Sequence, residues 1–537
     1  MLVLAVFGLL AAASLTILIS HALKPNIPRA WVIALVSTTI AWVVMLFLRL
    51  YLPTEINLVT WAPTEIFQGQ LDLVLDYQSW PFAVALITLC MATIFTDTTQ
   101  TNLASTPFSW AGSIAIALIN LVGILAGNPL TLVLAWALVD LVELIYLFNL
   151  SSDEQNNRTL VTSYAIRLLS LMTLISAMVV GWQAQPNFSL HEIPANASWI
   201  ILLAASLRLG TLPLKLPYLN RPETRQGITV LLRFAPVASA LILISHLNAL
   251  PEILGNPWLG ILHGITVLVA LYSSLMFATR PVKFQSQPYW IVALSAFAVR
   301  CVLNGAAQTS RVWGLALLLS GAMLYLFEPP IRRIRFLPLL GLIGLIGVPF
   351  TLAASGWDAL IGSSLNLSLA PMILAHALLT VGYLRYIFEA NTTITALEKH
   401  ARITFPMGLV LILQTILMLG IVGWPGVLTV GKWWVPLISL GLVGLAILAF
   451  LKLGLKVPFT NLEQRLPFYR VLHAILTWFQ AFSSLDWLYS GAEFLGRHVG
   501  RVTNAVTGLI EGEGGLLWSL VFLIAMITIF VAGVKLP

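Results

Sequence analysis

The segment 127–148, GNPLTLVLAWALVDLVELIYLF, indicates the class of fold. Its only charged residues are Asp140 and Glu143, and it is long enough for a helix that crosses the hydrocarbon core of a bilayer, which needs about 20 apolar residues. In lipid, every backbone polar group has to be satisfied within the segment, so such runs form helices. The segment therefore predicts a transmembrane helix with two acids inside it.

The rest of the chain has the same character. Of its 537 residues, 59% are hydrophobic and 9% are charged, and the mean hydropathy is +0.93. A soluble domain carries roughly 25% charged residues, so a water-soluble enzyme, a disordered chain and a nucleic-acid-binding protein are excluded. We predict an all-α polytopic membrane protein with about sixteen transmembrane helices. The expected spans are 2–20, 31–51, 80–96, 107–127, 129–149, 160–182, 198–216, 226–246, 258–278, 287–306, 311–327, 337–355, 367–388, 404–426, 433–453 and 514–534.

Basic residues concentrate in alternate loops between these spans. Examples are Arg158, Arg221, Arg280, Arg333 and Arg402. By the positive-inside rule these loops are cytoplasmic, and both termini lie on the non-cytoplasmic side. We expect a bacterial-type inner (plasma) membrane or a thylakoid-like internal membrane.

Two segments do not have the pattern of a span. Residues 52–79 are acidic and alternate between polar and apolar, which predicts an external β-hairpin. Residues 454–513 contain apolar positions near helical spacing, which favours a lateral amphipathic segment along the membrane or partner helices, with a solvated linker as the alternative. The predicted organisation is a transmembrane core over 1–453, this lateral segment, and a C-terminal transmembrane anchor over 514–537.

Charged side chains inside spans are expensive and mark functional candidates. Asp140 and Glu143 lie three residues apart and share one helix face, and Arg167 and Arg208 are the nearest candidate counter-charges. This pairing fits a proton or cation path and a static tie between helices equally well. His246 lies near the outer edge of its span, where we expect a surface residue.

Further candidates for the ion path are Arg233 and His263, although a satisfied core histidine is the alternative for His263. Pro213 and Pro349 lie within predicted spans, where proline removes a helix hydrogen bond and can mark a helix break near an ion site. A simple kink is the alternative.

The order of these features resembles the antiporter-like membrane subunits of respiratory complex I, of Mrp cation/proton antiporters and of membrane-bound hydrogenases. The resemblance is carried by LDYQSWPFAVAL (75–86), by the segment 127–148, by SLRLGTLPLKLPYLNRPET (206–224), by GLIGLIGVPFTLAASGW (341–357) and by MLGIVGWPGVL (418–428). It implies a core of about fourteen helices in which helices 7 and 12 are broken. It also implies other integral membrane subunits, lipids, and protons or Na⁺ as partners.

The chain departs from the family pattern at its charged positions. Arg208 stands where the family has a relay lysine, Lys215 and Arg233 stand where it has histidines, and a later lysine falls at about Gly321. A buried lysine can lose its proton, whereas an arginine effectively never does. We therefore expect translocation by an altered route or none at all.

These patterns leave three functional hypotheses. The first is a subunit of a complex-I- or Mrp-like assembly that takes part in proton or cation translocation, and the second is a translocation-inactive scaffold subunit of such an assembly. The third is a stand-alone secondary transporter. The sequence shows no cofactor site, no metal-ligand spacing and no redox or hydrolytic site, so any enzymatic role would be that of a subunit in a proton-translocating NAD(P)H- or ferredoxin-quinone oxidoreductase-type complex.

Overall fold

The protein was analysed as a computed structural model. It describes residues 1–23, 26–60, 70–100, 106–150, 154–185, 188–212, 226–247, 256–280, 282–328, 331–361, 369–388, 400–425, 427–452, 474 and 520–528. The chain divides into two compact units, Met1–Ala474 and Ile475–Pro537. In the second unit the described part is a short helical stretch over 520–528 with exposed side chains. Apart from Ala474, the predicted lateral segment 454–513 lies outside the described residues.

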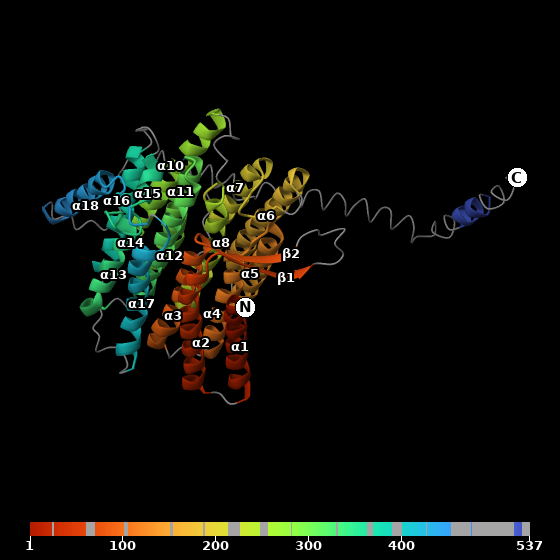
Figure 1. The fold of residues 1–537 in the computed structure, drawn as a ribbon, viewed down its shortest axis with the longest axis horizontal. Helices are drawn as coiled ribbons and strands as arrows, with labels where there is room; N and C mark the ends of the chain where they lie inside the picture. Colours follow the sequence, from red (N-terminus) through yellow and green to blue (C-terminus); the bar gives the residue numbers. More distant parts are fainter. Residues whose placement is uncertain are drawn as a thin grey trace. The chain divides into compact units, whose positions relative to one another are not determined.

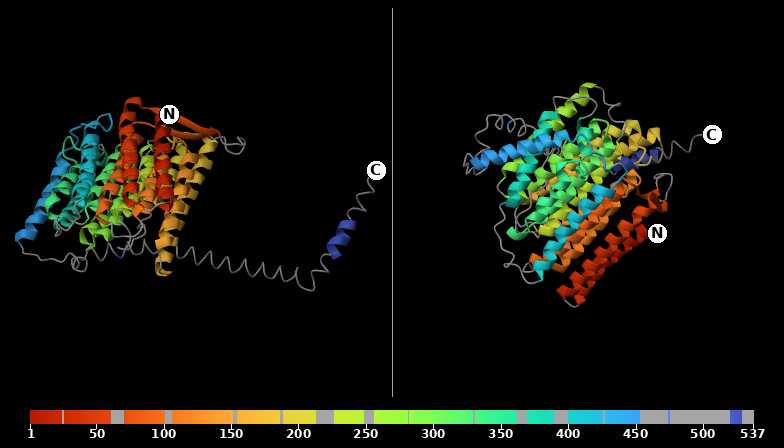
Figure 2. Two further views of the ribbon diagram at one scale, coloured as in Figure 1. Left: turned by 90° about the horizontal axis from the view of Figure 1, so that it is seen from below. Right: turned by 60° about the vertical axis from the view of Figure 1, so that its left-hand side comes forward.

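The first unit is an all-α bundle whose helices run side by side, with one β-hairpin (Figures 1 and 2). Its N-terminal half contains α1 (Leu2–Leu23), α2 (Ile27–Phe47), α3 (Ser79–Thr96), α4 (Thr106–Ile124), α5 (Pro129–Leu150), α6 (Glu154–Ala184), α7 (Ala195–Leu209) and α8 (Gln226–Ser245). Its C-terminal half contains α10 (Asn256–Thr279), α11 (Lys283–Leu303), α12 (Ser310–Leu326), α13 (Phe336–Gly341), α14 (Ile343–Ile346), α15 (Gly356–Ile361), α16 (Leu369–Phe388), α17 (Ala401–Val422) and α18 (Trp434–Lys452). Short 3-10 turns are η1 (Leu48–Tyr51), η2 (Asp97–Gln100), η3 (Ala307–Thr309) and η4 (Arg332–Ile334).

Twelve helices of the described residues are long and apolar enough to cross a membrane. The prediction of an all-α polytopic membrane fold is therefore confirmed. The other four predicted spans coincide with α7, the pair α13 and α14, α18, whose apolar stretch is Trp434–Leu448, and the stretch 520–528.

The centre of the bundle is formed by α3, α8, α11 and α12, whose apolar stretches are almost entirely buried. By contrast, α1 and α2 bury only a third of their apolar stretches inside the protein. A hydrogen bond from the Trp80 indole to the carbonyl of Met45, 2.8 Å long, ties α3 to α2.

The hairpin predicted for 52–79 is present. Strand β1 (Thr54–Thr60) pairs antiparallel with β2 (Gln70–Leu75), with Thr54 opposite Leu75. The amide of Val74 donates to the carbonyl of Leu125 at 2.7 Å, and the amide of Gly127 donates to the carbonyl of Asp72 at 2.8 Å. These bonds attach the hairpin to the connection between α4 and α5.

Two helix ends near the predicted breaks depend on glycine. Helix α7 ends where Gly210 takes a left-handed conformation (φ 71°), which only glycine adopts without strain. Helix α14 ends in the same way at Gly347 (φ 74°), so Pro349 lies in the non-helical stretch before α15. Pro213 lies outside the described residues.

Candidate functional site

The centre of the candidate site is an ion pair between α5 and α7. Asp140 accepts two hydrogen bonds from the Arg208 guanidinium, at 2.8 Å from Nη2 and 3.0 Å from Nη1. This two-bond geometry matches the planar fork of a guanidinium to the two oxygens of a carboxylate. Both residues are buried, and the Arg208 side chain is only 1% exposed. Arg208 can reach α5 because it lies in the last turn of α7.

A second pair lies beside the first. Glu143, one helical turn further along α5, accepts a hydrogen bond from Nη1 of Arg167 on α6. The same nitrogen lies 3.5 Å from Oδ1 of Asp140, so Arg167 contacts both acids. We call Asp140, Glu143, Arg167 and Arg208 the charge quartet. It contains two positive and two negative groups, which offsets much of the cost of burying each one.

Neighbouring side chains hold the quartet in place. The guanidinium of Arg208 stacks on the ring of Trp136, 4.5 Å from its centroid, and the indole N–H of Trp136 donates to Ser239 of α8 at 2.8 Å. The hydroxyl of Ser170 in α6 donates to the carbonyl of Ala204 in α7 at 2.7 Å. The quartet is therefore braced from α8 and by the contact of α6 with α7.

The acids are reachable from the face formed by α5 and α6. A recess of about 400 Å³ is lined by apolar side chains and by Asp140 and Tyr164. A smaller opening nearby is lined by Asp140, Glu143, Tyr164 and Arg167, together with Ser163 and leucines. Asp140 thus lines both openings, and Glu143 lines the smaller one.

The other predicted site residues are not part of the quartet. Arg233 is buried in α8, and His263 is half-buried in α10, within electrostatic range of Arg300. Lys215 lies outside the described residues. The structure thus brings together four of the seven predicted site residues, Asp140, Glu143, Arg167 and Arg208.

The C-terminal half has an aromatic core where the resemblance would place a lysine. A Cβ added at Gly321 would lie 2.5 Å from Nε1 of Trp290 and 2.9 Å from the ring of Phe234, so no larger side chain fits there without a shift. His376 bonds to the hydroxyl of Ser439 at 2.7 Å and to the carbonyl of Leu345 at 3.0 Å, which makes it a satisfied core histidine.

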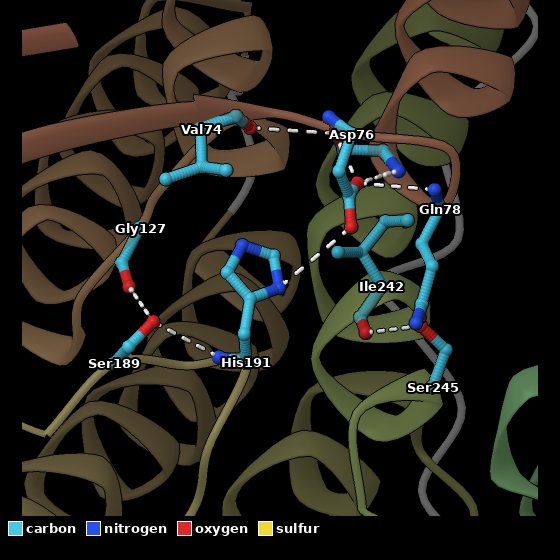
Figure 3. A network of polar contacts seen from close by, with 9 residues as sticks. Val74, Asp76, Gln78, Gly127, Ser189, His191, Ile242 and Ser245 are labelled. Atoms are coloured by element: carbon cyan, nitrogen blue, oxygen red, sulfur yellow. Dashed lines mark hydrogen bonds and ion pairs between the residues drawn. The ribbon is translucent and has the colours of Figure 1, made fainter. Parts of the chain in front are cut away.

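A second polar cluster, which the sequence did not reveal, lies beside the hairpin (Figure 3). In it, His191 from the loop before α7 contacts both Asp76, in the turn before α3, and His246, which follows α8. The expectation that His246 is a surface residue is wrong, because it is only 6% exposed. His191 was missed because a lone histidine in a loop carries no pattern.

No group of three or more His, Cys, Asp or Glu side chains in the described part of the chain is placed to hold a metal ion. The two cysteines, Cys90 and Cys301, are buried, and both are free thiols.

No protein-family model and no curated protein matches the sequence. Solved structures do match the fold. A chain of the Mrp complex from Dietzia sp. DQ12-45-1b aligns with a TM-score of 0.69 at 16% identity, over 99% of this chain and 63% of that one. The present chain thus spans less than two thirds of that subunit's length.

Two further structures align over nearly their whole chains. A chain of the membrane-bound sulfane sulfur reductase, an archaeal respiratory membrane complex, gives a TM-score of 0.66 at 14% identity over 98% of this chain and 99% of that one. A chain of respiratory complex I from Thermus thermophilus gives 0.58 at 14% identity over 80% and 100%. The chain is therefore similar in fold to membrane subunits of Mrp, sulfane sulfur reductase and complex I assemblies.

Proposed function

We propose that the chain is a membrane subunit of a multi-subunit assembly of the Mrp or complex I type, and that it takes part in proton or cation translocation. The observation that carries this proposal is the buried charge quartet, whose carboxylates line an opening on the α5–α6 face. Intramembrane ionisable groups are rare and commonly mark ion pathways. The similarity in fold to subunits of three such assemblies supports the same assignment.

Within the quartet, only the carboxylates can accept a proton. Arginine keeps its charge, so Arg208, which donates two hydrogen bonds to Asp140, would act as an electrostatic gate that repels cations. A proton arriving on Asp140 would leave Arg208 without its counter-charge in a low-dielectric environment, which is strongly unfavourable. Because Arg167 contacts both Asp140 and Glu143, a shift of Arg167 between the two acids would redistribute charge as a proton passes.

A scaffold subunit that does not translocate is the second candidate. It is favoured by the packing at Gly321, which leaves no room for the second charged centre that the resemblance implies, and by the two-bond lock on Asp140. In both cases the partners would be integral membrane subunits and lipids, with both termini on the non-cytoplasmic side of a bacterial-type membrane. The segments 454–513 and 514–537 would then brace and anchor the subunit.

The two candidates differ in the effect of neutralising the acids. We expect Asp140→Asn with Glu143→Gln, made in the intact assembly and reconstituted in liposomes, to reduce proton or cation flux at least tenfold while the subunits remain assembled. The matched control is Glu55→Gln, an exposed acid on β1 that lies outside the quartet. Unchanged flux in the intact double variant would establish the scaffold instead. Flux through the purified single chain alone would favour the stand-alone transporter.

A further inference from the structure

A compact set of titratable groups lies at the hairpin end of α3, α8 and α12. Nδ1 of His191 is 3.7 Å from Oδ2 of Asp76, and the ring of His191 meets the ring of His246 edge-on with centroids 4.6 Å apart. The fourth member is Arg311 at the start of α12, which acts electrostatically on both Asp76 and His246. We call Asp76, His191, His246 and Arg311 the hairpin-end cluster.

The cluster is fixed in position by backbone contacts. Oδ1 of Asp76 accepts hydrogen bonds from the amides of Gln78 and Ser79 at 3.0 and 2.7 Å, which fixes the turn before α3 and leaves Oδ2 directed at His191 (Figure 3). The amide of His191 donates to the hydroxyl of Ser189, which itself donates to the carbonyl of Gly127. The two imidazoles are therefore held together by the loop before α7 and the end of α8.

The two imidazoles lie in different surroundings. The His191 side chain is 29% exposed and lies against the Asp76 carboxylate. His246 is almost fully buried, and burial, together with His191 and Arg311, lowers the pKa of His246 to about 4 although Asp76 acts in the opposite direction. Arg311 is already positive, and two charged imidazoles in contact would repel each other. The cluster can therefore bind one proton on its imidazoles but not two.

We propose that Asp76, His191 and His246 form a proton-binding site that holds one proton, separate from the charge quartet, and that this site exchanges protons with the aqueous compartment at the hairpin end. The ligand is a proton, and the more exposed His191, whose Nδ1 lies 3.7 Å from Oδ2 of Asp76, is its outer acceptor. His246 is the inner acceptor, at the end of the buried helix α8. The exchange role rests on the proposed function in translocation, whereas the sharing of one proton does not.

The shared proton is tested by measuring, for each histidine of the intact assembly, the pH dependence of hydrogen exchange at the imidazole C2 position by mass spectrometry. We expect His191→Asn to raise the protonation midpoint of His246 by roughly one unit or more, because a like charge disappears. Asp76→Asn should lower that midpoint, and its remaining side-chain oxygen can still accept from the amides of Gln78 and Ser79. The control His400→Asn changes a histidine at the N-terminal end of α17 and should leave the midpoint of His246 unchanged.

If His191→Asn leaves the His246 midpoint where it was, the two imidazoles do not share a proton and the proposal is overturned. The exchange role is tested separately by proton flux in liposomes, which we expect to fall at least threefold in His191→Asn. Wild-type flux in that variant, combined with loss of flux in the quartet variant, would refute the exchange role while leaving the proposed function intact. Wild-type flux in both variants would refute the proposed function, whereas the midpoint measurement would still decide on the shared proton.

Discussion

Removing one partner of the pair between Asp140 and Arg208 should destabilise the protein far more than removing both. Arg208→Gln leaves the Asp140 carboxylate buried without its two hydrogen bonds of 2.8 and 3.0 Å. Breaking a buried ion pair in this way costs about 3–5 kcal/mol, and the stacking on Trp136 adds about 1 kcal/mol. Because Arg167 lies 3.5 Å from Asp140 and can compensate in part, we expect a loss near the lower end, about 3 kcal/mol.

The double variant Arg208→Gln with Asp140→Asn removes both charges together. Replacing a whole buried pair is often nearly neutral. We therefore expect the double variant to recover about 1–2 kcal/mol of the free energy of unfolding that the single variant loses. The assay is denaturant unfolding in mixed micelles, followed by tryptophan fluorescence. The control Arg29→Gln removes an exposed cation at the start of α2 and should change stability by no more than about 0.5 kcal/mol. A double variant no more stable than the single one would refute the electrostatic account of the quartet.

Three further predictions use the same chain. Gly321→Leu should destabilise by about 1–3 kcal/mol in the same unfolding assay, because the added side chain collides with Trp290, and a stable variant would contradict the packing described here. Trp136→Phe should cost about 1 kcal/mol, because it removes the hydrogen bond to Ser239 while keeping an aromatic face under the guanidinium. Burial raises the pKa of Asp72 above 3.8, so hairpin docking should be strongest below that pH and weaken as the pH rises through the raised pKa. Amide hydrogen exchange of β2, corrected for intrinsic rates, measures the stability of hairpin docking at each pH. Asp72→Asn should abolish its pH dependence.

Much of the fold follows from the lengths of the apolar runs, because a helix is the only regular structure in which a single segment satisfies its own backbone in lipid. The hairpin follows from the polar and apolar alternation of 52–79. The spacing of Asp140 and Glu143 placed both acids on one face, and that face required cations from adjacent helices. The sequence could not assign a partner to each acid, because Arg167 reaches both of them, and this depends on how α5, α6 and α7 pack.

The hairpin-end cluster shows a different limit of sequence reasoning. Asp76, His191 and His246 are far apart in sequence, and none of them belongs to a periodic pattern. His246 looked like a surface residue because it ends a span. The structure buries it because the loop carrying His191 and the turn before α3 both cover the end of α8. Such a site depends on which loops meet at one end of the bundle, and this is determined by the packing of whole helices.

The two candidate functions differ in whether the acids of the quartet ever become neutral. A scaffold needs only a permanent pairing, and the contacts between Arg208 and Asp140 supply one. A permanent pairing does not require a guanidinium within reach of two carboxylates at once, yet Arg167 has that position. Nor does it require an opening that leads to Asp140 from the α5–α6 face. Because Arg167 contacts both acids, it would still have a carboxylate neighbour, Asp140, if Glu143 took up a proton. The position of Arg167 therefore favours translocation by the carboxylates, with both arginines as fixed counter-charges.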